Sequence, residues 1–494
     1  MCRQLLLLFL ILFFVRNGCA QEALSSAAMD LKKSSITSTF PISDSDQNIH
    51  IIAIKEGFSE DGILHITHDA ETNILAHHSY DKPDAIATKN AVGIAVDPAN
   101  TIHLYFHKKG KGEFHRVMID EEGKLTYDTF ELKLKKERVV QYISENNKFL
   151  MMTVNRNQSI LNVYRFEGSS HKKSIYDLTG ERFYSKESKI VPLPKLLIET
   201  DISAISNELS SNAKDYGKRI KIYPRKDTIT LTINSNDNGT RIIHLSRKDN
   251  TISADYVPMP TGEFVEGREI TIRTNSFLHN DKLYSLIMSN KLLIVDIKRM
   301  DNKEVVKVFR FSPEEEISFK RTQTSVLPIG PITLYNTKTK EKTKSAKSFF
   351  RDLKNEWYSG LYVNQKGTTT VLKIGGYSPP SDVTALPNGF GPGAVSASED
   401  AFGNISIASS GPISYRGNLY NYYSLGVEKR LVFKADNYEM LADNTYKDIY
   451  DTIDALTADM ESVAHQALLK IEDHYIFGYY DKENERYSLI KLTP

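Results

Sequence analysis

The sequence contains almost no cysteine. Only Cys2 and Cys19 occur among its 494 residues, and both lie near the N-terminus. If that end is removed on export, the mature chain has no thiol, which excludes a disulfide framework, a cysteine zinc site and a thiolate nucleophile. Its stability must then come from a buried core, which a chain of this length can provide because about 75% of its surface is buried on folding.

The sequence also has little net charge and few long apolar runs. Its 63 basic and 62 acidic residues give a formal charge of +1. This balance argues against nucleic acid as a partner, because neutralised phosphates supply most non-specific affinity. No run approaches the about 20 apolar residues that a membrane-spanning helix needs, so we expect no transmembrane segment. The remaining composition is typical of an ordered globular protein.

The N-terminus has the features of a secretory signal. Arg3 precedes an apolar run of eleven residues, Leu5 to Val15, and small residues follow at Gly18 and Ala20. This pattern predicts a signal peptide over residues 1–20, cleavage before Gln21, and a periplasmic or extracellular location. The alternative is a lipid anchor on Cys19, but the residue three positions before it is Arg16, where a lipobox has an aliphatic residue.

Much of the remaining chain repeats one pattern, in which short runs of β-branched and aromatic residues alternate with polar turns. Four such runs fill residues 91–132, the same plan recurs over 138–178, and 270–311 has the same size. A unit of four strands and about 40 to 50 residues is typical of a propeller blade. We therefore predict an all-β protein, a β-propeller over residues 49–494 after an N-terminal extension at 21–48. An antiparallel sandwich is the alternative.

Two segments resemble NHL-type repeats. Residues 93–104 contain a small apolar strand, Asp97, a short turn and a second strand from Ile102, and residues 395–408 repeat that spacing with Asp400 and Ile405. The resemblance covers two blades and implies a propeller in which these aspartates cap turns. We expect seven blades, with six or eight as alternatives because the spacing widens over 180–217 and 312–410.

Other segments complete the predicted organisation. We expect the last strand, Tyr487 to Leu492, to close the ring by pairing with His50 to Ile54. Apolar spacing of three and four residues predicts one short surface helix over Lys447–Ala464 and a weaker one over Asp201–Leu209. Proline and glycine mark 375–393 as a loop. Lys338–Lys347 alternates lysine with polar residues, which indicates a solvated loop or, alternatively, a docking site for an acidic partner.

Eight of the 13 histidines lie between positions 50 and 115. On a strand His103 and His107 share a face, whereas His65 and His68 point to opposite faces. No HExxH or similar ligand spacing is present, so we expect surface histidines on outer strands, with a metal site or a catalytic histidine as alternatives. Residues 234–239 superficially resemble a calcium loop but fit a hairpin turn better. We therefore expect no metal and no cofactor.

No motif identifies a catalytic residue. The sequence has no GxSxG elbow and no phosphate-binding GxxxxGK[ST] loop. The single tryptophan, Trp357, lies near Tyr358 and Tyr362, and aromatic faces of this kind suit sugar or peptide contact, although core packing also explains them. We expect these three residues to bind ligand. The hypothesis is an exported, non-catalytic propeller that binds a protein or glycan at the cell envelope or outside the cell. The alternative is a propeller hydrolase or lyase with its site in the central channel.

Overall fold

A computed structural model describes the chain in several stretches. They are residues 23–28, 34–57, 62–69, 73–83, 86, 90–107, 112–145, 147–168, 170–206, 213–260, 272–289, 291–329, 332–355, 358–378, 397–399, 405–407, 425–441, 448–457, 463–471, 474–481 and 483–492. The expected signal peptide and both cysteines lie outside these residues. The chain divides into two compact units, one comprising residues 1–81, 414–417 and 448–494, the other 82–413 and 418–447.

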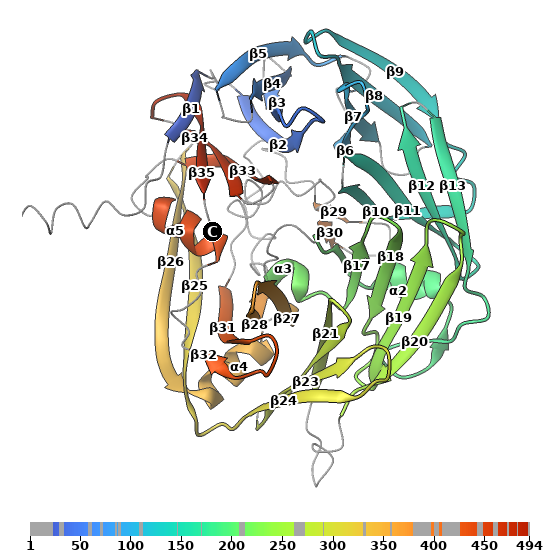
Figure 1. The fold of residues 1–494 in the computed structure, drawn as a ribbon, viewed down its shortest axis with the longest axis vertical. Coiled ribbons are helices and arrows are strands. Elements are labelled where there is room, and N and C mark those ends of the chain that lie inside the picture. Colours follow the sequence, from blue (N-terminus) through green and yellow to red (C-terminus); the bar gives the residue numbers. More distant parts are fainter. Residues whose placement is uncertain are drawn as a thin grey trace, which may run out of the picture. The chain divides into compact units, whose positions relative to one another are not determined.

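The first unit contains two four-stranded antiparallel sheets and a helix (Figure 1). One sheet follows chain order: β2 (Ser34–Ser43), β3 (Ile49–Gly57), β4 (Gly62–His68) and β5 (Ile74–Asp81). The other has the order β1 (Ala23–Ala28), β35 (Arg486–Leu492), β34 (His474–Asp481) and β33 (Val463–Ile471). Helix α5 (Ile449–Thr457) buries Ile449 and Ile453, so the helix predicted over Lys447–Ala464 is present but shorter.

In the second unit the described residues form five larger sheets. Two follow chain order: β6 (Asn90–Val96), β7 (Ile102–His107), β8 (Glu113–Ile119) and β9 (Leu125–Glu131); then β10 (Glu137–Glu145), β11 (Lys148–Asn155), β12 (Ile160–Glu167) and β13 (Ser170–Asp177). Two more are β16 (Ile202–Ala204), β17 (Ile220–Pro224), β18 (Thr228–Ile233), β19 (Gly239–Ser246) and β20 (Ile252–Pro258); and β21 (Arg273–His279), β22 (Lys282–Met288), β23 (Leu293–Arg299) and β24 (Val305–Phe311).

The fifth sheet crosses over in sequence. Its order is β26 (Ile332–Ser345), β25 (Glu316–Ile329), β31 (Leu425–Lys434), β28 (Thr369–Ser378) and β27 (Tyr358–Lys366), with β32 (Met440–Leu441) beside β31. The same unit has two small hairpins and three helices: β14 (Phe183–Tyr184), β15 (Ile190–Val191), β29 (Ala397–Glu399), β30 (Ile405–Ile407), α2 (Leu193–Glu199), α3 (Ala213–Tyr216) and α4 (Ala346–Asn355).

The chain is a β-propeller, as predicted. The three segments predicted as four-strand units coincide with the sheets β6–β9, β10–β13 and β21–β24. The described residues form seven sheets of at least four strands, and the number of blades in the ring stays a prediction. Middle strands such as β7 are buried along their whole length, whereas outermost strands such as β9 alternate. This is the burial expected when sheets pack face to face.

Polar turn residues connect the strands. Asp97 caps the turn between β6 and β7, since its Oδ1 accepts hydrogen bonds from the backbone N–H groups of Ala99 and Thr101 at 2.9 and 3.0 Å. Asn100 adopts a positive φ of 56° in the same turn, which asparagine tolerates. Neighbouring sheets also pack closely, since a Cβ atom placed on Gly93 would lie only 2.1 Å from the ring of Phe149.

The predicted strand pairing of the C-terminus is wrong. Strand β35 pairs with β1 and β34, whereas β3, which contains the predicted partner His50–Ile54, is flanked by β2 and β4. Both edges of β3 are therefore occupied. The segment 21–48, predicted as an extension, contributes the strands β1 and β2 to the sheets. The first and last described strands thus belong to one sheet.

Two further local predictions are wrong. Residues 202–204, predicted as part of a helix, form β16, which pairs with β17 in parallel. Residues 338–347, predicted as a loop, form the end of β26 and the start of α4. Lysine and threonine alternate there, and threonine favours the extended backbone that pairs with β25. The loop predicted at 375–393 begins as strand β28 up to Ser378, and its remainder lies outside the described residues.

Candidate ligand pocket

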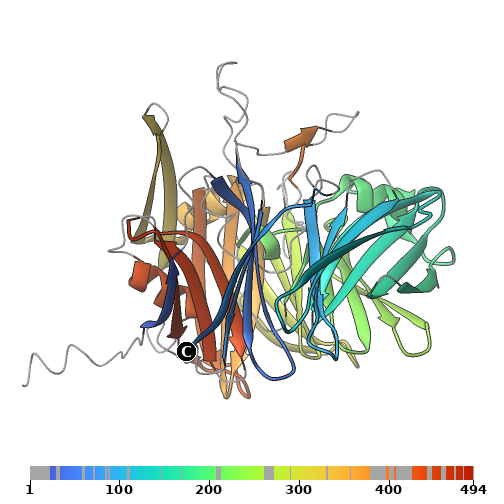
Figure 2. The same ribbon diagram turned by 90° about the horizontal axis from the view of Figure 1, so that it is seen from above.

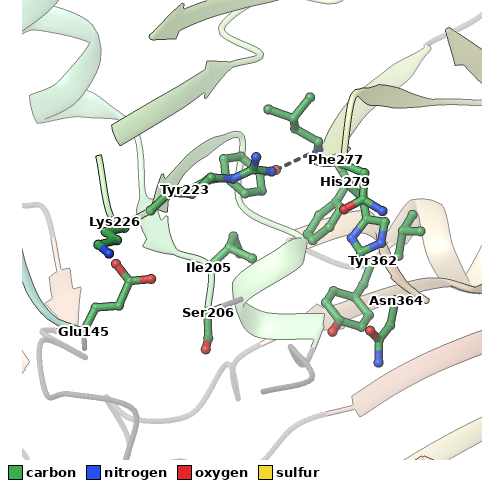
Figure 3. Close-up of a pocket in the computed structure, with 13 residues that line it drawn as sticks. Glu145, Ile205, Ser206, Tyr223, Lys226, Phe277, His279, Tyr362 and Asn364 are labelled. Atoms are coloured by element: carbon green, nitrogen blue, oxygen red, sulfur yellow. Dashed lines mark hydrogen bonds between the residues drawn. The ribbon is translucent and has the colours of Figure 1, made fainter. Parts of the chain in front are cut away.

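A cavity of about 340 Å³ lies in the second unit, where the first strands of several sheets end (Figure 3). Its walls come from the end of β10, the residues after β16, the end of β17, the end of β21 and the middle of β27. In Figure 1 these strands face the interior of the unit. The inner strand of each propeller blade borders the axis, and pockets form there because neighbouring strands diverge at their ends.

Three aromatic rings form one wall of the pocket. Phe277 packs edge-to-face against Tyr223 and against Tyr362, with ring centroids 5.6 and 5.2 Å apart. The hydroxyl of Tyr223 accepts a hydrogen bond from the Leu278 backbone N–H at 3.0 Å, which fixes the ring between β17 and β21. All three aromatic side chains are nearly fully buried. The wall is therefore rigid and apolar.

Polar groups line the rest of the pocket. Figure 3 shows Glu145 and Lys226 on one side and His279 with Asn364 on the other. Arg225 is exposed in the tight turn after β17, where its backbone N–H donates to Thr228 at 2.8 Å. Among the described residues, its guanidinium makes no hydrogen bond or ion pair. The pocket thus offers a cation that has no ion-pair partner in the part of the chain that the structure describes.

His279 is neutral at physiological pH. Burial lowers its pKa to about 4, and the positive charges of Arg225 and Lys282 add to the shift. Its Nε2 is buried and has no hydrogen-bond partner among the described residues. Asn280 follows in a turn with φ of 50° and also lines the cavity. A neutral imidazole with a free nitrogen can donate to or accept from a ligand hydroxyl.

The structure places two of the three residues predicted to bind ligand, Tyr358 and Tyr362, and only Tyr362 of these two lines the pocket. Tyr358 lies outside it, where its ring stacks on Tyr377 at 6.3 Å, the Lys218 ammonium lies 5.8 Å from its centroid, and its hydroxyl donates to Asp201. Trp357 lies outside the described residues. Sequence reasoning missed the other lining residues, most of which lie at or just after the ends of β10, β16, β17 and β21.

A second cavity of about 500 Å³ lies beside the β14–β15 hairpin, in the same unit. Its polar groups are largely paired with each other: Arg241 forms an ion pair with Glu181, and Asn238 donates to Ser188 Oγ at 3.0 Å. Asn238 belongs to the segment that resembled a calcium loop, which is a hairpin turn between β18 and β19, as predicted. Paired groups make this cavity a weaker candidate for ligand binding.

The histidines predicted on the surface are mostly buried. Six of the eight have less than a tenth of their surface exposed: His50, His65, His68, His103, His107 and His115. They bond to different partners, such as Asp97 for His103 and Tyr142 for His107. Among the described residues, no three His, Cys, Asp or Glu side chains could share a metal ion. These six histidines are buried because several of the strands that carry them are covered on both faces.

Two of these histidines form a hydrogen-bonded chain in the first unit. Asp44 Oδ2 lies 3.2 Å from His50 Nε2, and His50 Nδ1 lies 3.0 Å from His65 Nε2. The arrangement fits two neutral rings, each protonated at Nε2, with the aspartate accepting from His50 and His50 accepting from His65. A further proton would go to His65 Nδ1, which is buried without a partner among the described residues.

Acid is therefore expected to destabilise the first unit. Burial lowers the pKa of His50 and lowers that of His65 to about 3, with repulsion from neighbouring histidines contributing. The unfolded chain binds more protons, so stability is complete above about pH 6.5 and falls by up to about 1.4 kcal/mol per pH unit for each histidine below that. His65→Phe should flatten the melting temperature between pH 8 and pH 5, whereas His171→Phe, at an exposed site, should not. Equal slopes in both variants would contradict this.

The sequence and the fold were compared with known proteins. No family profile and no curated protein match the sequence. The Cps50 (Swd1) β-propeller domain of Myceliophteria thermophila has 9% identity and a TM-score of 0.29, covering 93% of this chain and all of that one. A Lactobacillus plantarum protein has 10% identity and a TM-score of 0.26, covering 68% of this chain and 79% of that one.

A further match is to a mutant of AofleA from Arthrobotrys oligospora, with 11% identity and a TM-score of 0.24, covering 65% of this chain and 89% of that one. Similarities this distant carry no conclusion about activity or ligand. Among the described residues, no helix has the length and apolar character needed to cross a bilayer. The sheets and their order identify the chain as a β-propeller, and no narrower family is shown.

Proposed function

We propose that the chain is an exported, non-catalytic propeller that binds an acidic glycan in the pocket of about 340 Å³. The observation that carries the proposal is an aromatic wall beside the exposed Arg225, which makes no ion pair among the described residues. Arg225 suits a carboxylate, because a guanidinium and a carboxylate form two parallel hydrogen bonds. The amides of Asn280 and Asn364 suit sugar hydroxyls, and apolar sugar faces pack on aromatic residues.

Export and location belong to the same proposal. The apolar run from Leu5 to Val15 and the small residues at Gly18 and Ala20 support a cleaved signal peptide, and a glycan ligand suits the cell envelope or the outside of the cell. The NHL-type assignment of residues 93–104 is likewise proposed, supported by the turn that Asp97 caps. Its second example, 395–408, lies mostly outside the described residues. A protein ligand remains the alternative partner.

A lyase is the second candidate function, favoured by the neutral His279 near the positive charge of Arg225. On a uronic acid, the imidazole could take the proton from the ring carbon that bears the carboxylate. The electron pair would form a carbon–carbon double bond and the bond to the glycosidic oxygen would break, with that oxygen protonated by solvent. A hydrolase acting through two carboxylates has less support, since Glu145 is the sole carboxylate among the described lining residues.

The test compares oligosaccharides of galacturonic acid with those of galactose, which differ in the carboxylate. We expect calorimetry to show binding of the acidic series alone, and Arg225→Gln to weaken it about ten- to a hundredfold, because a charge-assisted hydrogen bond is lost. Arg299→Gln, at an exposed site in the same unit, is the matched control. Equal affinity for both series of oligosaccharides, or an affinity for the acidic series that Arg225→Gln leaves unchanged, would refute the acidic-glycan proposal. Ultraviolet absorbance from an unsaturated product would instead establish the lyase.

A further inference from the structure

The second cavity, of about 500 Å³, lies at the opposite end of the strands from the ligand pocket. Arg225 of the pocket is in the turn between β17 and β18, whereas Asn236 and Asn238 of the cavity are in the turn between β18 and β19. Because β18 pairs with both neighbours in antiparallel register, these turns lie at its two ends. Figure 2 shows these strands (green) from the side, with turns at either end. The six residues of β18 span about 20 Å, so one short ligand cannot fill both sites.

Three segments of the second unit form the cavity. Asn238 Nδ2 donates to Ser188 Oγ at 3.0 Å, which holds the hairpin of β14 and β15 against the β18–β19 turn. Glu181, just before that hairpin, forms an ion pair with Arg241 on β19. Tyr256 on β20 is opposite Arg241 in the register. Since these contacts fix all three segments, the cavity is already formed in the fold without a ligand.

Two tyrosines give the cavity an aromatic side. Tyr256 is 37% exposed, and its ring lies over Gly239, where an added Cβ atom would be 2.5 Å from the ring atom Cζ. Only glycine leaves room for the ring at that position. Burial raises the pKa of Tyr256 and the nearby Tyr184 adds to the shift, so the two hydroxyls lie close together. Partly exposed rings in a cavity suit the apolar face of a sugar.

The polar lining leaves one positive charge and one amide unpaired. Glu181 neutralises Arg241, whereas the exposed Arg182 makes no ion pair or hydrogen bond in the part of the chain that the structure describes. The side-chain oxygen of Asn236 accepts from the Asn238 backbone N–H at 3.0 Å, and its amide nitrogen donates to no group among the described residues. Asn236 is only 5% exposed. A buried donor of this kind is costly to leave unpaired, so it favours a ligand oxygen.

The cavity and the pocket have the same kinds of lining groups. Each combines aromatic rings, asparagine amides and an arginine that has no ion-pair partner among the described residues. A chance gap between packed segments would account for the space. It would not account for an amide that is almost fully buried and yet unpaired within the described chain.

We propose that the second cavity is another site for the acidic glycan, in which Arg182 binds the carboxylate and Asn236 binds a sugar hydroxyl. Its one unpaired cation, against Arg225 and Lys226 in the pocket, makes it the weaker of the two sites. Because the sites lie at opposite ends of the strands, one protein molecule bridges two glycan chains. This inference rests on the ligand class of the proposed function, and adds to it a second site and a cross-linking activity.

The first test counts bound ligand by calorimetry with a trisaccharide of galacturonic acid. We expect two molecules per unaltered chain, and one each for Arg182→Gln and Arg225→Gln. Lys186→Gln, at an exposed position of the same hairpin but outside the cavity, should still bind two. Tyr256→Ala should lose the second molecule, whereas Tyr127→Ala, at an exposed position of the outermost strand β9, should keep it. Melting temperatures of all five variants confirm that each is folded.

The second test is light scattering after addition of polygalacturonate. The unaltered protein should aggregate the polymer, whereas Arg182→Gln and Arg225→Gln should bind it without aggregation, because one site cannot bridge two chains.

The outcomes separate the two proposals. One molecule per unaltered chain, kept by Arg182→Gln and lost by Arg225→Gln, would support the proposed function and overturn this inference. One molecule lost only by Arg182→Gln would overturn the proposed function and leave the second cavity as the glycan site. Two molecules still bound by both Arg182→Gln and Tyr256→Ala, or two molecules without aggregation of the polymer, would overturn the inference, and no binding at all would overturn both proposals.

Discussion

Ending the chain after Glu485, which removes strand β35, is expected to destabilise the first unit by several kcal/mol, a large part of the about 5–15 kcal/mol typical of a domain. Strand β35 lies between β34 and β1, so its loss removes two ladders of backbone hydrogen bonds. Four of its side chains are buried: Tyr487, Leu489, Ile490 and Leu492. Arg486 also donates to the Ser26 carbonyl oxygen at 2.8 Å, so β1 loses its partner too.

Point variants separate the packing of β35 from the loss of a strand. Leu489 is fully buried, and Leu489→Ala should cost about 2–5 kcal/mol and lower the melting temperature by several degrees. Lys491 is exposed on the same strand, and Lys491→Ala should change stability by less than about 0.5 kcal/mol. Thermal unfolding of the truncated chain and both variants checks this. A truncated chain that melts within a degree or two of the full one would show that β35 contributes little.

The regular sheets could be predicted because each of their turns has its own local chemistry. In one turn the Asp97 carboxylate accepts hydrogen bonds from two backbone N–H groups. In two others Asn147 and Asn280 adopt the positive φ that a tight turn between strands requires. Such signals are short-range and repeat at each hairpin, so they can be read from one sequence. The crossed fifth sheet has no equivalent signal, since β31 reaches its neighbours from a distant part of the chain.

The incorrect predictions concern segments whose strand pairing or burial depends on residues far away in the sequence. Five of the six residues of strand β1 are alanine or serine, which have low β propensity, and it is a strand because β35 offers a free edge. The histidines were placed on the surface because alternation along one strand does not reveal whether a second sheet covers its other face. His115 lies on β8, which is covered in this way and largely buried.

Of the residues that line the candidate site, the sequence predicted only Tyr362. It was chosen because it lies near Trp357 in the sequence, whereas it lines the pocket because of its packing against distant residues. Its neighbours Tyr223 and Phe277 lie about 140 and 85 positions away in the chain, and only the packing of first strands brings them together. Arg225 follows β17 and His279 ends β21, and neither strand differs from the others in sequence pattern. The Arg225 guanidinium and His279 Nε2 are distinguished by having no hydrogen-bond partner among the described residues, which requires coordinates to see.

A buried lysine is another group whose role the sequence could not show. Lys221 on β17 is fully buried, and its Nζ atom donates to the Lys218 carbonyl oxygen at 2.6 Å and to Asn275 Oδ1. Two donated hydrogen bonds use both hydrogens of a neutral amine. Burial, with repulsion from Arg219, holds the pKa of Lys221 well below its usual value. The side chain links β17 to β21 through these two hydrogen bonds, and its burial favours the neutral form.

The pH dependence of stability should reveal the lowered pKa of Lys221. The unfolded chain keeps the proton up to about pH 10.4, so it binds more protons than the folded chain, and stability should rise with pH by up to about 1.4 kcal/mol per unit from the lowered pKa of Lys221 upward. Lys221→Met loses two hydrogen bonds but also loses the proton linkage. Its melting temperature relative to the unaltered chain should therefore improve as pH falls from about 10.4 toward the lowered pKa of Lys221. Lys195→Met, at an exposed site on α2, should follow the unaltered chain. A constant difference for Lys221→Met across that range would mean that Lys221 stays charged in the fold.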